Sequence, residues 1–209
     1  MAVTAYESYE GDLRVASGDT VRVDGDVEGN VVVEPSGKVE IGGSIQGDLV
    51  SSGYALVDGD VEGAVTAGPG SRVEIAGSVS GDVVTRGHTV IDGEVEGNVV
   101  AGPGAKVGIS GSVSGKIVAK GHVVVDGEVE GSVVVGSGGR TEVAGSISGD
   151  AVCDGVLIVD GNVEGSTTLG KRGRGYSERI VKFWDLMSSF AGSSRPMECK
   201  FRFDALSHR

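Results

Sequence analysis

Aromatic side chains are scarce in this 209-residue chain: they make up 4% of it, beside four prolines and two cysteines. The 38 glycines have no matching proline content and follow no Gly-X-Y period, which excludes a collagen helix. Apolar residues reach 39%, many of them valine and isoleucine, and this suits a narrow core of short strands better than a broad globular core. Cys153 and Cys199 are too few for a disulfide framework or a metal site.

Basic residues are also few outside the C-terminal segment. The net charge is −12; residues 171–209 carry nine basic and four acidic side chains, a net charge of +5, which leaves −17 for residues 1–170. An acidic body repels nucleic acid, so we expect no nucleic-acid partner. The segment 1–15 lacks the basic and apolar regions of a signal peptide, and no stretch is long enough to span a membrane. We therefore expect a cytoplasmic location.

A seven-residue motif recurs along the chain at a constant spacing. The sequence VDGDVEG begins at residue 23 and returns with small changes at 57, 91, 125 and 159. A second series, of the type IGGSIQG, begins at 41, 75, 109 and 143 and has the same spacing. The two series interleave, so the unit is a winding of about 17 residues. Helical repeats of similar length are excluded because each unit contains several glycines and many β-branched residues.

Apolar residues within each winding occur in pairs two positions apart, such as Val21 and Val23. This spacing predicts short strands whose apolar side chains face inward, while intervening residues such as Arg22 face outward. Glycines such as Gly25 and Gly29 are expected at corners, where they would supply the dihedral angles that a corner requires. Stacking of one winding on the next would pair the backbone along the rod axis.

Residues 5–13 have the pattern of a degenerate first winding. In this alignment Ala5, Tyr9, Gly11 and Leu13 match Val23, Val27, Gly29 and Val31. Together with nine clear windings, this predicts an all-β fold over residues 1–170: a single-stranded β-helix, or solenoid, of about ten windings. At about 4.8 Å per layer, such a rod would be roughly 45–50 Å long.

Longer and shorter windings alternate: the motifs that begin at residues 23, 41 and 57 are 18 and then 16 residues apart. The two lengths differ because the windings have different corners. Longer windings contain a wide corner such as GPGSR at residues 68–72, and shorter ones contain a three-residue corner such as RGH at 86–88. Acidic triplets such as Asp24, Asp26 and Glu28 also alternate with neutral residues in the next winding. Carboxylates stacked in every layer would lie about 5 Å apart and repel, and the alternation roughly doubles that distance.

The polar residues give little indication of catalysis or ligand binding. Carboxylates of the acidic column would lie about 10 Å apart, too far to share a calcium ion with oxygen ligands at about 2.4 Å. His88 and His122 occupy a position that other windings fill with tyrosine or valine, which favours a surface corner over a catalytic role. Cys153 takes an inward position, which predicts a buried structural thiol. We expect no catalytic residue, cofactor or metal. The acidic column consists of Asp24, Asp58, Asp92, Asp126 and Asp160.

The repeat ends near Gly170, and all four phenylalanines and the only tryptophan follow it. The apolar spacing over residues 178–190 predicts a helix with one apolar face and with Ser177 as its N-cap. Over residues 197–203 apolar and charged residues alternate, which predicts a strand. Residues 171–209 are therefore expected to form a basic, aromatic C-terminal extension. Three interpretations stay open: a cap over the last winding, a membrane-surface helix, or a patch for a partner or for self-association.

The repeated units V-x-G-x-V-x-G-x-[VIL], seen at residues 23–31 and 75–83, resemble those of the bactofilins, polymer-forming cytoskeletal proteins of bacteria with relatives in archaea. The resemblance covers roughly residues 9–169. It implies a compact right-handed β-helix of triangular section that polymerises end to end without nucleotide. It also implies filaments that often lie under the membrane and position other proteins.

We therefore expect a non-enzymatic structural protein that assembles with itself, through its terminal windings, into nucleotide-independent filaments or scaffolds. A membrane-associated adaptor acting through the C-terminal helix is one alternative. An acyltransferase of the hexapeptide-repeat class is another, although its apolar positions recur every six residues and those of this chain do not. The residues expected in a self-association surface or cap are Tyr9, Leu13, Val15, Ile180, Phe183, Trp184, Met187, Phe190, Phe201 and Phe203.

Overall fold

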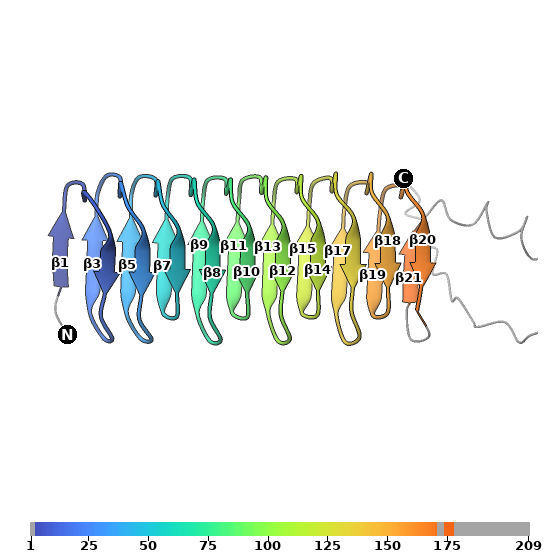
Figure 1. Ribbon diagram of the computed structural model, residues 1–209, viewed down its shortest axis with the longest axis horizontal. Helices are drawn as coiled ribbons and strands as arrows, with labels where there is room; N and C mark the ends of the chain where they lie inside the picture. The colour runs from blue at the N-terminus through green and yellow to red at the C-terminus, as the bar shows by residue number, and fades with distance from the viewer. Residues whose placement is uncertain (1–2, 171–173, 178–209) are drawn as a thin grey trace, which may run out of the picture.

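Short parallel strands stack one behind another along a straight rod in the computed structural model, which describes residues 3–170 and 174–177 (Figure 1). Four-residue strands form one sheet of 11 strands and three-residue strands form a second sheet of 10. The first sheet runs in the order β1 (Val3–Tyr6), β3 (Thr20–Val23), β5 (Lys38–Ile41), β7 (Tyr54–Val57), β9 (Arg72–Ile75), β11 (His88–Ile91), β13 (Lys106–Ile109), β15 (His122–Val125), β17 (Arg140–Val143), β19 (Val156–Val159) and β21 (Arg174–Ser177). The second runs in the order β2 (Leu13–Val15), β4 (Val31–Val33), β6 (Leu49–Ser51), β8 (Val65–Ala67), β10 (Val83–Thr85), β12 (Val99–Ala101), β14 (Ile117–Ala119), β16 (Val133–Val135), β18 (Ala151–Cys153) and β20 (Thr167–Leu169).

A third column of pairing consists of single-residue parallel bridges that run from Tyr9 and Val27 to Val163. Each winding therefore contains one strand of each sheet and one bridge residue, and ten such windings precede β21. The predicted all-β solenoid of about ten windings is confirmed, and the described part of the chain contains no helix. The handedness inferred from the bactofilin resemblance stays a prediction.

Apolar side chains from all three columns fill the centre of the rod. In the second winding Val21, Val23, Val27, Val31 and Val33 are buried, and the same inward positions are buried in the windings that follow as far as Val159. In the last winding Val163 is partly buried and β20 is exposed. This confirms that residues two apart face inward together. Cys153 is fully buried at one of these positions, as predicted.

The pairing register confirms the alternation of shorter and longer windings. Lys38 pairs with Tyr54 across a shorter winding, and Tyr54 pairs with Arg72 across a longer one. The wide corners are tight turns: the Ser71 N–H donates to the Gly68 carbonyl at 3.2 Å, and Gly70 between them has a φ of 77°. This φ lies in the left-handed region that glycine adopts at no steric cost.

The dihedral explanation for Gly25 and Gly29 was wrong. Among the described glycines a positive φ occurs only at residues 11, 18, 70, 104 and 138, so these two residues do not supply an unusual dihedral. They are required because adjacent windings approach closely: a Cβ on Gly29 would lie 2.4 Å from the backbone carbon of Gly11. Glycine therefore sets how closely the layers can stack at these corners.

The first winding differs from its expected alignment. Tyr6, not Ala5, pairs with Val23, while Tyr9 pairs with Val27 as predicted. The first winding is one residue shorter between these two positions than the second, and the sequence pattern did not reveal this deletion. At the other end, β21 pairs with β19, so the first sheet continues past residue 170. The predicted helix at 178–190 and strand at 197–203 lie outside the described residues.

Candidate association surfaces

The N-terminal end of the rod is an open sheet edge. In the second winding, backbone groups that face this end bond to the first winding; for example, the Asp24 N–H donates to the Tyr6 carbonyl and the Glu28 N–H to the Tyr9 carbonyl, at 2.9 and 3.0 Å. The equivalent groups of the first winding face away from the rod and have no backbone partner among the described residues. These groups are the N–H of Glu7, Glu10 and Ala16 and the carbonyls of Ser8 and Asp12.

Exposed apolar side chains accompany this edge. All four residues of β1 are exposed, with Val3 78% and Tyr6 38% accessible. The Tyr6 ring packs edge-on against Tyr9, with centroids 5.0 Å apart, and Tyr9 is partly buried against the core. Val3 and Tyr6 were not among the predicted residues, because the misaligned first winding did not identify β1.

All three association residues predicted at this end lie in the first winding. Tyr9 is partly buried, and Leu13 and Val15 belong to the edge strand β2 but turn their side chains into the core, where they are buried. Their part in self-association stays a prediction. At the C-terminal end, β20 is exposed and Leu169 is 38% accessible. The predicted residues of the extension lie outside the described residues: Ile180, Phe183, Trp184, Met187, Phe190, Phe201 and Phe203.

Polar side chains at the corners bond the backbone of the following winding, a role that the sequence pattern did not predict. The Asp26 carboxylate accepts from the Ser44 N–H at 2.8 Å, and the Ser44 hydroxyl accepts from the Asp60 N–H at 3.1 Å. A second column does the same, as where the Asn30 side chain accepts from the Asp48 N–H at 2.8 Å. The sequence does contain a sign of these hydrogen bonds, because Asp, Asn or Ser recurs at one position in successive windings. From the sequence alone, that alternation is explained only as a way to keep carboxylates apart.

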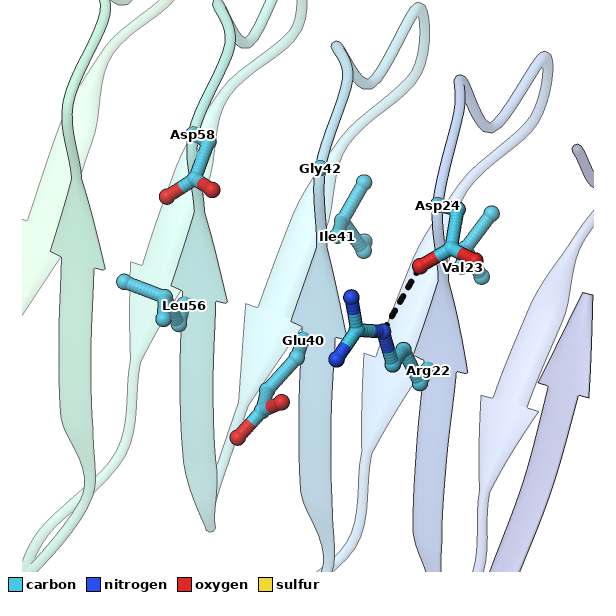
Figure 2. A pocket seen from close by; sticks show the side chains of 8 residues that line it. All are labelled: Arg22, Val23, Asp24, Glu40, Ile41, Gly42, Leu56 and Asp58. Atoms are coloured by element: carbon cyan, nitrogen blue, oxygen red, sulfur yellow. Dashed lines mark hydrogen bonds and ion pairs between the residues drawn. The ribbon is translucent and has the colours of Figure 1, made fainter. Parts of the chain in front are cut away.

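The outer face of the first sheet carries ion pairs around a shallow hollow of about 140 Å³. Figure 2 shows Arg22, Glu40 and Leu56 on this face, with Asp24 and Asp58 on either side of the intervening strand. The Arg22 Nε lies 2.6 Å from Asp24 Oδ1, and this hydrogen bond raises the pKa of the guanidinium. The hollow is smaller than the roughly 300 Å³ that small-molecule sites usually need.

A similar ion pair joins Lys38 and Glu40 on β5, with Nζ and Oε1 2.6 Å apart, and lowers the pKa of the Glu40 carboxyl. Glu142 accepts from Arg140 at 2.6 Å and lies 3.3 Å from the His122 ring. Arg140 and, to a lesser extent, His122 lower the pKa of the Glu142 carboxyl. His88 and His122 begin β11 and β15 at the surface corners where they were predicted.

The described part of the chain contains no group of three or more His, Cys, Asp or Glu residues placed to hold a metal ion. Across residues 3–170 and 174–177, no helix has the length and apolar character needed to cross a bilayer.

Comparison with known proteins gives one family match. The bactofilin family model, described as polymer-forming cytoskeletal, matches residues 3–87. This part of the chain belongs to the bactofilin family. No curated protein and no solved structure matches the chain significantly.

The bactofilin segment comprises the strands β1 to β10, and therefore includes the open N-terminal edge. Beyond residue 87 the strand pairing continues without interruption, since β11 pairs with both β9 and β13. The family and the fold together fit a polymer-forming cytoskeletal protein.

Proposed function

We propose that this rod is a non-enzymatic building block that associates with other copies, end to end through its terminal windings, into nucleotide-independent cytoskeletal filaments. The observation that carries the proposal is the open N-terminal edge formed by β1, Tyr9 and β2. Within the described residues the N-terminal pairing groups of this edge have no backbone partner, although the same groups are satisfied in each later winding.

The composition of the edge strand supports this role. Monomeric proteins protect exposed edges with proline, charged residues or bulges, because an open edge pairs readily with another chain. β1 has the sequence VTAY, without proline or charge, and all its residues are exposed. The β1 part of the edge therefore lacks the usual protection against pairing.

Assembly of this kind needs no nucleotide. Backbone hydrogen bonds and apolar side chains hold successive windings together inside the rod, as in the parallel pairing of β1 with β3. The same two kinds of contact would join two rods, because each further layer repeats the pairing at about 4.8 Å.

The test is electron microscopy and sedimentation of the purified full chain in nucleotide-free buffer. Ala5→Pro removes an N–H from the edge strand, while Ala5→Val keeps that N–H and serves as the matched control. We expect filaments from the native chain and Ala5→Val, and short or absent filaments from Ala5→Pro with an unchanged circular dichroism spectrum. Monomers that persist in the native chain at high concentration would refute the proposal.

A further inference from the structure

A nearly continuous column of valines lies on the outer face of the second sheet. The middle residue of each three-residue strand points outward, and from β4 to β18 it is an aliphatic residue in all layers but one, where Thr66 takes its place. We call this the valine strip; it consists of Val32, Val50, Thr66, Val84, Val100, Val118, Val134 and Val152.

The first sheet has no equivalent strip. Its outward residues alternate between aliphatic side chains and charged or small ones, as in Leu56 followed by Glu74, and Val90 followed by Gly108. From Glu40 onward a charged or small residue separates each aliphatic one from the next, whereas the second sheet repeats valine layer after layer. The first sheet has two outward positions per winding and the second sheet has one, so only the second sheet presents a single, almost unbroken aliphatic column.

The strip is accessible and only shallowly hollowed. Val50, Val84 and Val152 are 40%, 41% and 40% exposed, and they rank among the most exposed large apolar residues in the described part of the chain. A hollow of about 240 Å³ lies over Val84, Val100 and Val118, and Arg86 and Lys120 line it too. This hollow is open and below the roughly 300 Å³ of ordinary ligand pockets, so a small molecule is a poor fit.

The size of the strip matches a weak interface with another macromolecule. The strands stay aligned along the rod (Figure 1), so the column runs straight over eight layers, about 38 Å at 4.8 Å per layer. A three-residue strand spans about 10 Å, so the face covers roughly 380 Å², and two such faces bury about 760 Å², less than the roughly 1,200 Å² of a stable specific interface.

We propose that a second copy of this chain packs on the valine strip, face to face, to form a lateral pair of rods. The partner that best fits a straight column of valines at about 4.8 Å spacing is another column with the same spacing, because their side chains can interdigitate at every layer. A membrane surface fits less well, because it offers no column of matching spacing between whose side chains the valines could interdigitate.

Lateral pairing is independent of end-to-end assembly, since it uses the side of the rod and not its edges. The area of one pair gives only a weak complex. Where rods are also joined in line, many strips would act together and the pairing would strengthen through effective concentration.

Small-angle X-ray scattering and sedimentation velocity on the full chain test the proposal, because lateral pairing doubles the cross-section and end-to-end assembly increases only the length. The double variant Val84→Lys/Val118→Lys places charges on the strip, and Val90→Lys/Val124→Lys places them at outward positions of the first sheet. We expect the strip variant to return to a single-rod cross-section, with pairing weakened at least about tenfold, and the control to remain paired. Ala5→Pro should shorten assemblies and leave the cross-section doubled.

A native chain with a single-rod cross-section at high concentration would overturn the proposal, as would a strip variant that stays paired. Loss of vesicle binding in the strip variant, with no change of cross-section, would assign the strip to a lipid surface instead. If the lysine variant fails to fold, Val84→Thr/Val118→Thr follows the native Thr66 and should weaken pairing by a smaller factor. Unchanged pairing in the threonine variant would then count against the proposal.

Discussion

Replacing Gly115 by alanine tests directly whether close layer stacking, and not backbone dihedrals, explains the corner glycines. A Cβ on Gly115 would lie 2.2 Å from the Gly97 carbonyl oxygen and 2.8 Å from the Asn98 nitrogen. Both are backbone atoms of the preceding winding, so no flexible side chain can move aside. The two windings must separate locally to accept the methyl group.

The cost follows from the bonds that separation would break. The Ser114 N–H donates to the Val95 carbonyl and the Val99 N–H to the Lys116 carbonyl, both at 2.9 Å, on either side of Gly115. Losing two such bonds costs about 2 kcal/mol, and overpacking adds about 1–3 kcal/mol. We therefore expect Gly115→Ala to lower the free energy of unfolding by about 3–5 kcal/mol.

Two other glycines provide matched controls. Gly104 has a φ of 80° with open space around it, so Gly104→Ala should cost only about 1–2 kcal/mol. Gly108 has open space and no positive φ, so Gly108→Ala should stabilise the rod by about 0.4–1 kcal/mol. Urea denaturation followed by circular dichroism gives the order of midpoints. If Gly115→Ala proves no more harmful than Gly104→Ala, the close-stacking explanation fails.

Further substitutions test the core, the ion pairs and the corner hydrogen bonds. The hydroxyl of Thr141 is buried without a partner, so Thr141→Val should raise the unfolding free energy by about 1 kcal/mol, whereas Thr89→Val, which removes a bonded hydroxyl, should lower it by about 1 kcal/mol; urea midpoints separate the two. The pKa of Glu142 is lowered by its arginine partner, so this pair stabilises the fold above the ordinary glutamate pKa of about 4.3 and loses its effect as pH falls through the lowered value. Glu142→Gln should therefore be slightly less stable than the native chain at neutral pH and equal to it at about pH 2, and a persistent difference in acid would contradict this account. Asp48 accepts from the Ala64 N–H at 2.8 Å, so Asp48→Ala should cost about 1 kcal/mol and speed hydrogen exchange at that amide.

Much of the fold could be predicted from the sequence, because in a repeat protein one short motif describes every layer. The spacing of Val21 and Val23 identified the inward positions, and the constant steps between motifs indicated the number of windings. The buried place of Cys153 followed from the same pattern. Each of these three predictions depends on residues close in sequence or on a motif that is repeated many times along the chain.

The association surfaces were harder to predict, because they depend on departures from the repeat. Val3 and Tyr6 were missed since one residue is deleted between Tyr6 and Tyr9, and a single degenerate winding does not reveal its own register. The valine strip was also missed. The alternation of inward and outward residues already turns Val84 and its equivalents outward, and the structure adds that Val50, Val84 and Val152 are about 40% exposed in one aligned column.

The sequence by itself determined the period, the inward columns and the positions of the wide corners, since these follow from side-chain alternation and turn chemistry within a single winding. Only the tertiary structure decided which atoms meet between windings. The close approach of Gly97 to Gly115 and the bond from Asp26 to Ser44 each join residues one full winding apart, and both depend on how closely two layers stack. The distance between layers results from core packing and backbone hydrogen bonding along the whole rod, so the sequence of a single winding does not determine it.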